Sequence, residues 1–197
     1  QACSGKSVLI TGASSGLGRQ MAIEFAQRGY RVALTARRLG ELTALQAELQ
    51  QAVSSPVIVA ELDVTDDEAI TRVFASVLAQ WGTLDIVVAN AGVGHHGYIG
   101  KLPFFKVREV VNTNVTGFMA TVDAAMHCFR EQGFGHLVGI SSVAAFRGMP
   151  AGGAYGASKA AVTTYLESLR AETHGTKVHV TTLSPGFIDT PLNRGAK

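Results

Sequence analysis

Tyr155 and Lys159 stand four residues apart in the segment AYGASKAA, and together they could transfer a proton. On a helix this spacing places both side chains on one face. A phenol titrates near pH 10, and a cation one turn away favours the phenolate, which makes the phenol a better acid and base near neutral pH. Reduction of a carbonyl needs such a proton together with a hydride from a cofactor. Most pairs at this spacing are only surface neighbours, so the surroundings must decide.

The residues before this pair favour a site. Ser141 and Ser142 end an apolar run that is typical of a strand, and Ser142 precedes Tyr155 by thirteen residues. Open α/β sheets bind ligands at the carboxyl ends of their strands. A loop rich in glycine and alanine separates the serines from the tyrosine, so backbone or a ligand can approach closely.

A second candidate site is the glycine-rich stretch TGASSGLG, residues 11–18, directly after an apolar run. Gly12 would allow a tight turn, Gly16 would let the backbone approach phosphates, and Gly18 would let a helix pack close to the strand. The spacing is G-x3-G-x-G, which differs from the common dinucleotide fingerprint. Taken alone, the stretch is also compatible with an ordinary turn.

The segment TARR at the end of the second apolar run indicates which cofactor would bind. An acidic residue usually holds a free ribose 2′-hydroxyl at this point. Arg37 and Arg38 stand there instead, and an arginine can hold a 2′-phosphate with two charge-assisted hydrogen bonds. This favours NADP(H), with NAD(H) still possible, and Arg37 is the preferred ligand. The alternative is that both arginines are solvated surface charges.

Composition excludes several other classes of protein. The 197 residues carry a formal net charge of +2 and 47% hydrophobic residues, as expected of a globular chain with no nucleic-acid-binding surface. Cys3 and Cys128 form no metal-ligand pattern, and no apolar stretch is long enough for a membrane span. We therefore expect a cytoplasmic protein without a bound metal.

The elements that must position these residues alternate along the chain. Apolar runs typical of buried strands lie at 7–11, 31–36, 56–62, 84–90, 135–141 and 177–184. Helical patterns lie between them at 16–29, 39–52, 66–82, 114–129 and 153–175. Strict alternation with short connections predicts parallel strands joined by right-handed crossovers. The predicted fold is a single α/β domain, a doubly wound Rossmann-type sheet with helices on both faces.

Taken in order, these motifs resemble the short-chain dehydrogenase/reductase family over essentially the whole chain. The matching segments are TGASSGLG, LDVTD at 62–66, NAG at 90–92, NTNVTG around Asn114, Ser142, Tyr155 with Lys159, and PGFIDT at 185–190. Any one of them could arise by chance, but their joint order and spacing make chance improbable.

The resemblance implies a role for each matching residue. Tyr155 would be the general acid and base, Lys159 would lower the pKa of Tyr155 and hold the nicotinamide ribose, and Ser142 would bind the substrate oxygen. Asn114 would bend its helix and support a proton relay, although a purely structural role is the alternative. The implied cofactor-binding residues are Gly12, Ser14, Ser15, Gly16, Leu17, Gly18, Arg37, Arg38, Asp63, Val64, Asn90, Ala91, Gly92, Tyr155, Lys159, Pro185, Gly186, Ile188 and Thr190.

Some residues invite other interpretations. Asp63 could simply begin a helix cap, and the tandem His95 and His96 are expected at a solvent-facing rim because no third metal ligand accompanies them. A nucleotide-binding sensor without turnover is the main alternative function, but a sensor has no need for the Ser142, Tyr155 and Lys159 set. A methyltransferase would use the glycine turn and not the tyrosine–lysine pair.

The family also implies partners and a further segment. Its members act on small-molecule carbonyls or alcohols and pair through the helices predicted at 114–129 and 153–175, so a homodimer or homotetramer is expected. Family members usually continue past PGFIDT with helices that cover the substrate and a final strand. We expect that the full-length protein carries these elements beyond Lys197; a truncated protein is the alternative.

Overall fold

Six parallel strands form one sheet in the order β3-β2-β1-β4-β5-β6 in the computed structural model, which describes residues 5–186 and residue 188. The strands are β1 (Ser7–Thr11), β2 (Arg31–Ala36), β3 (Val57–Glu61), β4 (Ile86–Ala89), β5 (Gly135–Ile140) and β6 (Val178–Leu183). Each lies within two residues of its predicted range. The order reverses between β1 and β4, and at such a reversal the carboxyl ends of the strands leave a crevice for a ligand.

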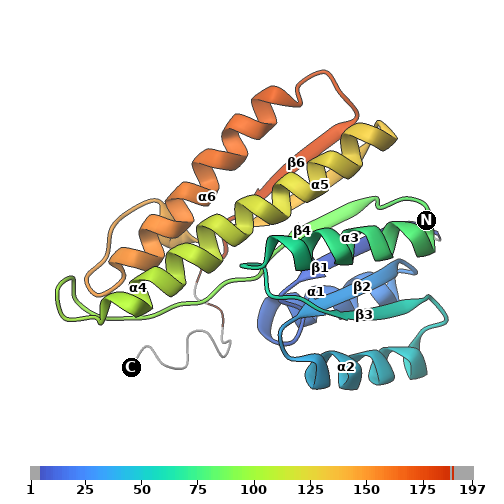
Figure 1. Ribbon diagram of the computed structural model, residues 1–197, viewed down its shortest axis with the longest axis horizontal. Coiled ribbons are helices and arrows are strands. Elements are labelled where there is room, and N and C mark those ends of the chain that lie inside the picture. Colours follow the sequence, from blue (N-terminus) through green and yellow to red (C-terminus); the bar gives the residue numbers. More distant parts are fainter. Residues whose placement is uncertain (1–4, 187, 189–197) are drawn as a thin grey trace.

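Helices cover both faces of the sheet (Figure 1). α1 (Gly16–Gln27) and α2 (Leu39–Ala52) pack on one face, against β1, β2 and β3. α3 (Asp67–Trp81), α5 (Phe118–Gln132) and α6 (Gly153–Glu172) pack on the other. The predicted doubly wound α/β fold is therefore confirmed.

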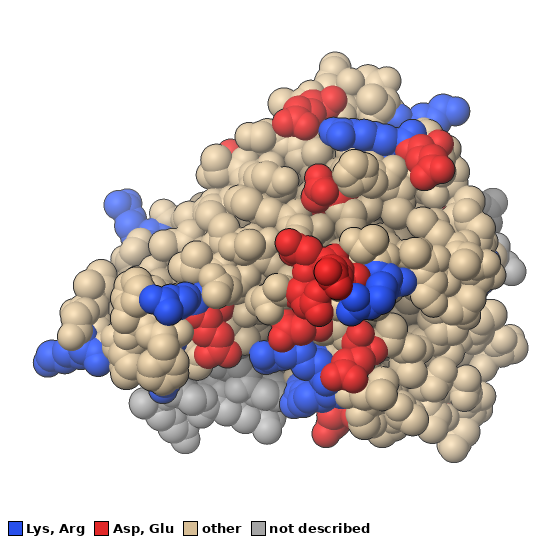
Figure 2. Space-filling view, in the orientation of Figure 1, with Lys and Arg blue, Asp and Glu red and all other residues tan. Residues whose placement is uncertain are grey.

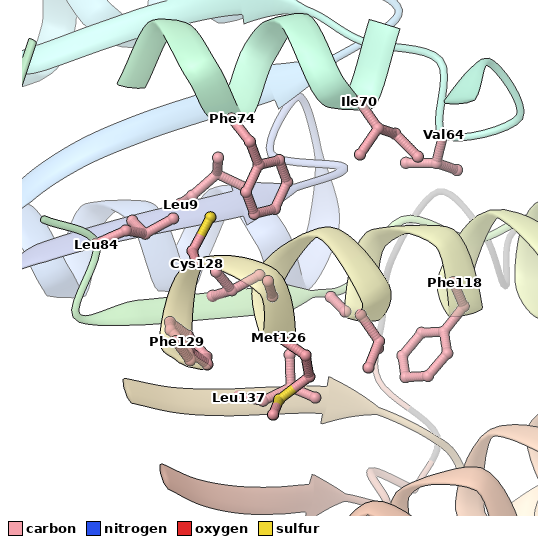
Figure 3. Packing of buried hydrophobic residues seen from close by; sticks show 14 of the residues in the cluster. Leu9, Val64, Ile70, Phe74, Leu84, Phe118, Met126, Cys128, Phe129 and Leu137 are labelled. Carbon is pink, nitrogen blue, oxygen red and sulfur yellow. The ribbon is translucent and has the colours of Figure 1, made fainter. Parts of the chain in front are cut away.

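The alternation of side chains along β1 shows why its sequence is apolar throughout. Leu9 points into the layer between the sheet and helices α3 and α5, where it packs near Phe74 and Cys128 (Figure 3). Val8 and Ile10 point to the opposite layer, under α1 and α2. All three are fully buried, and burying one such side chain contributes about 1.5–3 kcal/mol. A strand with a solvated face could not carry this sequence.

The helix predicted at 114–129 begins earlier than expected. α4 (Phe104–Val111) continues through a π-helical segment, η1 (Asn112–Gly117), directly into α5. The predicted start was wrong because Phe104 and Phe105 are mostly exposed, so the first turn of α4 lacks an inward-facing apolar pattern. The π-helical segment places one extra residue in the turn that carries Asn114.

The face in view in Figure 2 carries Lys and Arg interspersed with Asp and Glu, without a broad basic patch. Among the described residues, no helix has the length and hydropathy required to span a bilayer.

Candidate active site

The glycine loop after β1 is shaped by close backbone approaches. Gly12 has φ of +69°, and a Cβ atom built on it would lie 2.9 Å from the Cα of Ala91. A Cβ atom on Gly18 would collide with the carbonyl oxygen of Gly12. A side chain at either position would push the loop away from β4 or the helix away from β1. The expected roles of these two glycines in the turn and in packing match this geometry.

Asn90 fixes the loop to the neighbouring strand. Its Nδ2 donates to the carbonyl oxygens of Thr11 at 2.8 Å and Gly12 at 3.3 Å. The hydroxyl of Thr11 in turn accepts from the backbone N–H groups of Asn90 and Ala91, both at 3.0 Å. Asn90 therefore holds β1 and β4 together at the point where the sheet order reverses.

A cleft of about 370 Å³ opens at this reversal, along the carboxyl ends of the strands. It runs from the ends of β2 and β3 to α6. The predicted residues that line it are Gly12, Ser14, Ser15, Gly16, Leu17, Gly18, Arg37, Arg38, Asp63, Val64, Asn90, Ala91, Gly92, Ser142, Tyr155, Lys159, Pro185, Gly186 and Ile188. Asn114 lies behind the lining, and Thr190 lies outside the described residues.

The two arginines at one end of the cleft differ in their contacts. Arg38 donates to the hydroxyls of Ser14 at 2.9 Å and Ser15 at 2.8 Å, so it braces the glycine loop. Arg37 is exposed and lines the cleft, and it forms no hydrogen bond or ion pair with the described residues. Arg37 is therefore free to bind an anion, whereas Arg38 is already engaged with the loop.

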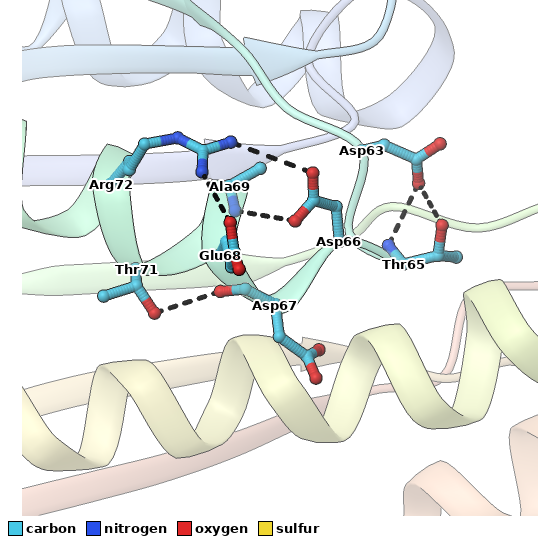
Figure 4. Close-up of polar contacts among 8 residues, drawn as sticks. All are labelled: Asp63, Thr65, Asp66, Asp67, Glu68, Ala69, Thr71 and Arg72. Carbon is cyan, nitrogen blue, oxygen red and sulfur yellow. Dashed lines mark hydrogen bonds and ion pairs between the residues drawn. The ribbon is translucent and has the colours of Figure 1, made fainter.

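Asp63 and Asp66 have different hydrogen-bonding roles near the Arg37 end of the cleft (Figure 4). Asp66 caps α3, because its carboxylate accepts from the backbone N–H of Ala69 at 2.9 Å. Asp63 accepts from the backbone N–H and hydroxyl of Thr65 at 3.0 and 2.8 Å. Asp63 thus shapes the turn before the helix cap while also lining the cleft.

Tyr155 and Ser142 meet at the other end of the cleft. Burial raises the pKa of Tyr155, and a hydrogen bond with the Ser142 side chain works in the opposite direction. The hydroxyl of Ser142 also accepts from the backbone N–H of Ala144 at 3.2 Å, which fixes it at the start of a short turn, η2 (Val143–Ala145). Ser141, by contrast, is directed to α6, where its hydroxyl donates to the Lys159 carbonyl oxygen at 3.0 Å.

Lys159 is buried beneath the tyrosine. Its Nζ donates to the carbonyl oxygen of Ile140 at 2.8 Å and lies 5.8 Å from the Tyr155 ring centroid. Burial lowers the pKa of Lys159 to about 8. Lys159 was expected to lower the pKa of Tyr155. In the protein without cofactor, burial of the phenol has the larger effect and raises that pKa.

Asn114 connects two parts of the site. Its amide Oδ1 accepts from the backbone N–H of Val93 at 2.8 Å, and its Nδ2 donates to the carbonyl oxygen of Val93 at 2.9 Å. The same Nδ2 donates to Ser158 at 3.1 Å, and the Ser158 hydroxyl donates to the carbonyl oxygen of Tyr155 at 2.7 Å. Asn114 and Ser158 are both buried. The side chain of Asn114 is thus occupied in joining the cleft wall to α6.

Sequence reasoning missed several residues at the catalytic end. The cleft there is also lined by Val93, Gly94, Ile140, Val143, Ala144, Arg147, Met149, Pro150, Gly152 and Gly156. Most belong to loops without periodicity, so only their nearness in sequence to Ser142 and Tyr155 could have indicated them. His96 is exposed at this rim as expected, whereas His95 is partly buried and pairs with Glu109 at 2.7 Å.

This arrangement fits a nicotinamide dinucleotide. The glycines leave backbone free to approach phosphates, and Arg37 offers a cation that has no partner among the described residues. The buried Ser142 and Lys159 and the partly buried Tyr155 lie at the far end of the same cleft. The residues could therefore hold an elongated anionic cofactor and transfer a proton beside it.

Comparison with known proteins agrees with this chemistry. Residues 6–197 match the family model described as short chain dehydrogenase. An uncharacterized oxidoreductase of Myxococcus xanthus is 47% identical over 187 residues, which cover 95% of this chain and 74% of that protein.

Solved structures of similar fold contain both forms of the cofactor. A short chain dehydrogenase/reductase from Burkholderia phymatum in complex with NAD has a TM-score of 0.92 and 29% identity, over 98% of this chain and 69% of that one. A serine dehydrogenase complexed with NADP+ has a TM-score of 0.90 and 33% identity, over 96% and 75% of the two chains. The chain therefore belongs to the short-chain dehydrogenase family, and it is an NAD(P)-dependent oxidoreductase that acts on CH–OH groups.

Proposed function

We propose that this protein is an NADP(H)-dependent oxidoreductase that interconverts a ketone and a secondary alcohol, with Tyr155 as the general acid and base. The observation that carries the proposal is the convergence of Ser142, Tyr155 and Lys159 at one end of the cleft that begins at the glycine loop. A sensor on the same scaffold would need only the other end.

Each catalytic side chain has one task in this proposal. The nicotinamide would supply the hydride in reduction and accept it in oxidation. In reduction the phenol of Tyr155 gives its proton to the carbonyl oxygen, and in oxidation the Tyr155 phenolate takes the proton from the hydroxyl. Ser142 holds that oxygen in place. Lys159 holds the ribose, and its charge stabilises the phenolate once the proton has left. Asn114 keeps the cleft wall and α6 in register and supports proton exchange with solvent.

Arg37 supports the preference for NADP(H). Its exposed guanidinium at the end of β2, which has no partner in the described part of the chain, can form a bidentate contact with a 2′-phosphate. No carboxylate stands at this position to hold a free 2′-hydroxyl. Ser14 would add a hydroxyl donor to the same phosphate, and Arg38 would act on the cofactor through its contacts with Ser14 and Ser15. NAD(H) would bind more weakly for want of this contact.

The rest of the cofactor site follows the same cleft. Ser15, Gly16 and Leu17 would contact the pyrophosphate, Asp63 and Val64 the adenine, and Ala91 and Gly92 the middle of the cofactor. Pro185, Gly186 and Ile188 would lie against the nicotinamide. We also propose a cytoplasmic homodimer or homotetramer that pairs through α5 and α6.

A panel of ketones and secondary alcohols tests the proposal, with the full-length protein and each cofactor followed at the nicotinamide absorbance. We expect turnover with NADPH or NADP+ at a higher kcat/KM than with NADH or NAD+. Tight NADPH binding without turnover of any compound would favour the sensor instead.

A further inference from the structure

Arg147 differs from nearly all other arginines in the part of the chain that the structure describes. Arg19, Arg28, Arg31, Arg38, Arg72, Arg108, Arg130 and Arg170 each contact a carboxylate, a hydroxyl, a carbonyl oxygen or an aromatic ring. Within residues 5–186 and 188, only Arg37 and Arg147 form no such contact. Both of these unpaired arginines line the same cleft.

The two arginines lie at opposite ends of that cleft. Arg37 follows β2 at the end assigned above to the 2′-phosphate. Arg147 lies in the segment between Ser142 and Tyr155, and Val143, Met149 and Pro150 of the same segment also line the cleft. This is the end where a substrate must lie if its oxygen is to reach Ser142 and Tyr155. The charge of Arg147 therefore faces the substrate end of the cleft.

No carboxylate balances Arg147 from the described lining. Asp63 is the only acidic residue among the described residues that line the cleft, and it belongs to the Arg37 end. The other titratable side chains on the catalytic end are His96, Tyr155 and Lys159, none of which is anionic near neutral pH unless the phenol ionises.

Simple solvation of an exposed arginine explains this pattern less well. Arg28, Arg72 and Arg130 are also exposed, yet each finds a carboxylate within 4 Å on the surface around it. An arginine that has no partner among the described residues, and that lies on the catalytic side of a cleft whose described lining there holds no acid, is expected where the partner is the ligand.

We propose that Arg147 is a specificity-determining residue that binds a carboxylate on the substrate, so that the substrates are hydroxy acids and the corresponding oxo acids. The inference rests on the proposed function. In oxidation the C–H hydride passes to NADP+, the hydroxyl proton passes to Tyr155, and the carbon–oxygen bond becomes a carbonyl. The carboxylate stays unchanged and serves only as the group that the guanidinium holds.

A matched pair of substrates tests this inference. The kcat/KM of the full-length protein is measured for a series of 3-hydroxy acids and for their methyl esters, which keep the reacting carbon and lose the charge. We expect the wild type to prefer the acid by about 10–100-fold, the range for a charge-assisted contact. Arg147→Gln should lose most of this preference, because its kcat/KM should fall for the acid and stay unchanged for the ester. Arg147→Lys should retain part of the preference.

Arg28→Gln is the control, because Arg28 is exposed at the end of α1, pairs with Glu24 and does not line the cleft. It should leave the acid-to-ester ratio unchanged. Equal turnover of acid and ester by the wild type, or an equal loss on both in Arg147→Gln, would overturn the inference and leave the proposed function standing. Absence of turnover for every ketone and alcohol in the earlier panel would overturn the proposed function, and this inference with it.

Discussion

The two ends of the cleft are built in different ways. At the glycine-loop end, the polar groups that face the cleft come from backbone and from exposed or half-buried side chains such as Arg37, Arg38 and Ser14. At the catalytic end, they come from the buried polar side chains of Ser142, Ser158 and Lys159, each of which has a partner on another element. The functional side chains of the first end are exposed to solvent, and those of the second are buried beneath an exposed rim, so we call the two the open end and the closed end.

This difference separates binding from chemistry. Charges in water interact weakly and can be exchanged at small cost, so the exposed end can decide which cofactor binds without affecting the fold. Buried polar groups change pKa and depend on one another, so the closed end decides the reaction and is costly to alter. Substitutions at the open end should therefore change cofactor binding, whereas substitutions at the closed end should change kcat or the free energy of unfolding.

The largest effect is expected at the closed end, from Tyr155→Phe. Removal of the phenolic oxygen leaves the ring in place but removes the proton donor, so kcat should fall by about 100–10,000-fold. The dissociation constant of NADPH, measured by fluorescence titration, should change little. A variant that retains near-normal turnover of a substrate of the wild type would exclude Tyr155 as the acid and base.

Lys159 should make the stability of the ligand-free protein depend on pH. Burial lowers its pKa from 10.5 to about 8, so between these values the unfolded chain binds more protons than the folded one. The free energy of unfolding should therefore rise with pH across this window, by up to about 3 kcal/mol from this group, while below pH 8 the cost of burying the charge is fully present.

Urea unfolding of the wild type and Lys159→Met from pH 7 to pH 10.5 measures this contribution as a difference, so that titrations common to both proteins cancel. The difference in the free energy of unfolding should increase with pH in favour of the wild type. Parallel curves would mean that Lys159 is not buried in its charged form.

At the open end, Arg37→Ala should weaken the binding of NADPH by about 10–100-fold, because only NADPH carries the 2′-phosphate. The dissociation constant of NADH should remain nearly unchanged. Arg38→Ala is the matched comparison. Because Arg38 braces Ser14 and Ser15, its removal should weaken the binding of both cofactors. If Arg37→Ala weakens the two cofactors equally, Arg37 does not bind the 2′-phosphate.

The smallest effect is expected from Ser158→Ala. It removes the link between Asn114 and the Tyr155 carbonyl oxygen and leaves one buried N–H of Asn114 without that partner. The free energy of unfolding should fall by about 1–3 kcal/mol, and kcat should fall by less than tenfold because Tyr155 and Ser142 remain.

Ser168→Ala is the control on the same helix, since the exposed hydroxyl of Ser168 contacts only the carbonyl oxygen of Thr164 among the described residues. It should change neither stability nor kcat. If the two serine variants behave alike, the buried link contributes nothing to the closed end.

The open end was largely predictable from sequence, and the closed end only in part. The strands, the glycine loop and the arginines after β2 are contiguous patterns that local rules recognise. The link from Val93 through Asn114 and Ser158 joins residues that are 21 and 44 positions apart, so no local period indicates it. Ser158 offered one signal, because it lies between Tyr155 and Lys159 in a helix whose inner face must be buried. The contact of Arg38 with Ser14 and Ser15 was not predicted for the same reason, because these residues are 24 and 23 positions apart.

The π-helical segment at Asn112–Gly117 makes the length of this part of the chain matter as much as its composition. An α-helix advances about 100° per residue. Deletion of one residue between positions 112 and 117 would restore a regular helix and would turn either Asn114 or the face of α4 by that angle. The hydrogen bonds to Val93 could not then form together with the packing of α5. Evolution can therefore exchange residues around this segment far more easily than it can change their number.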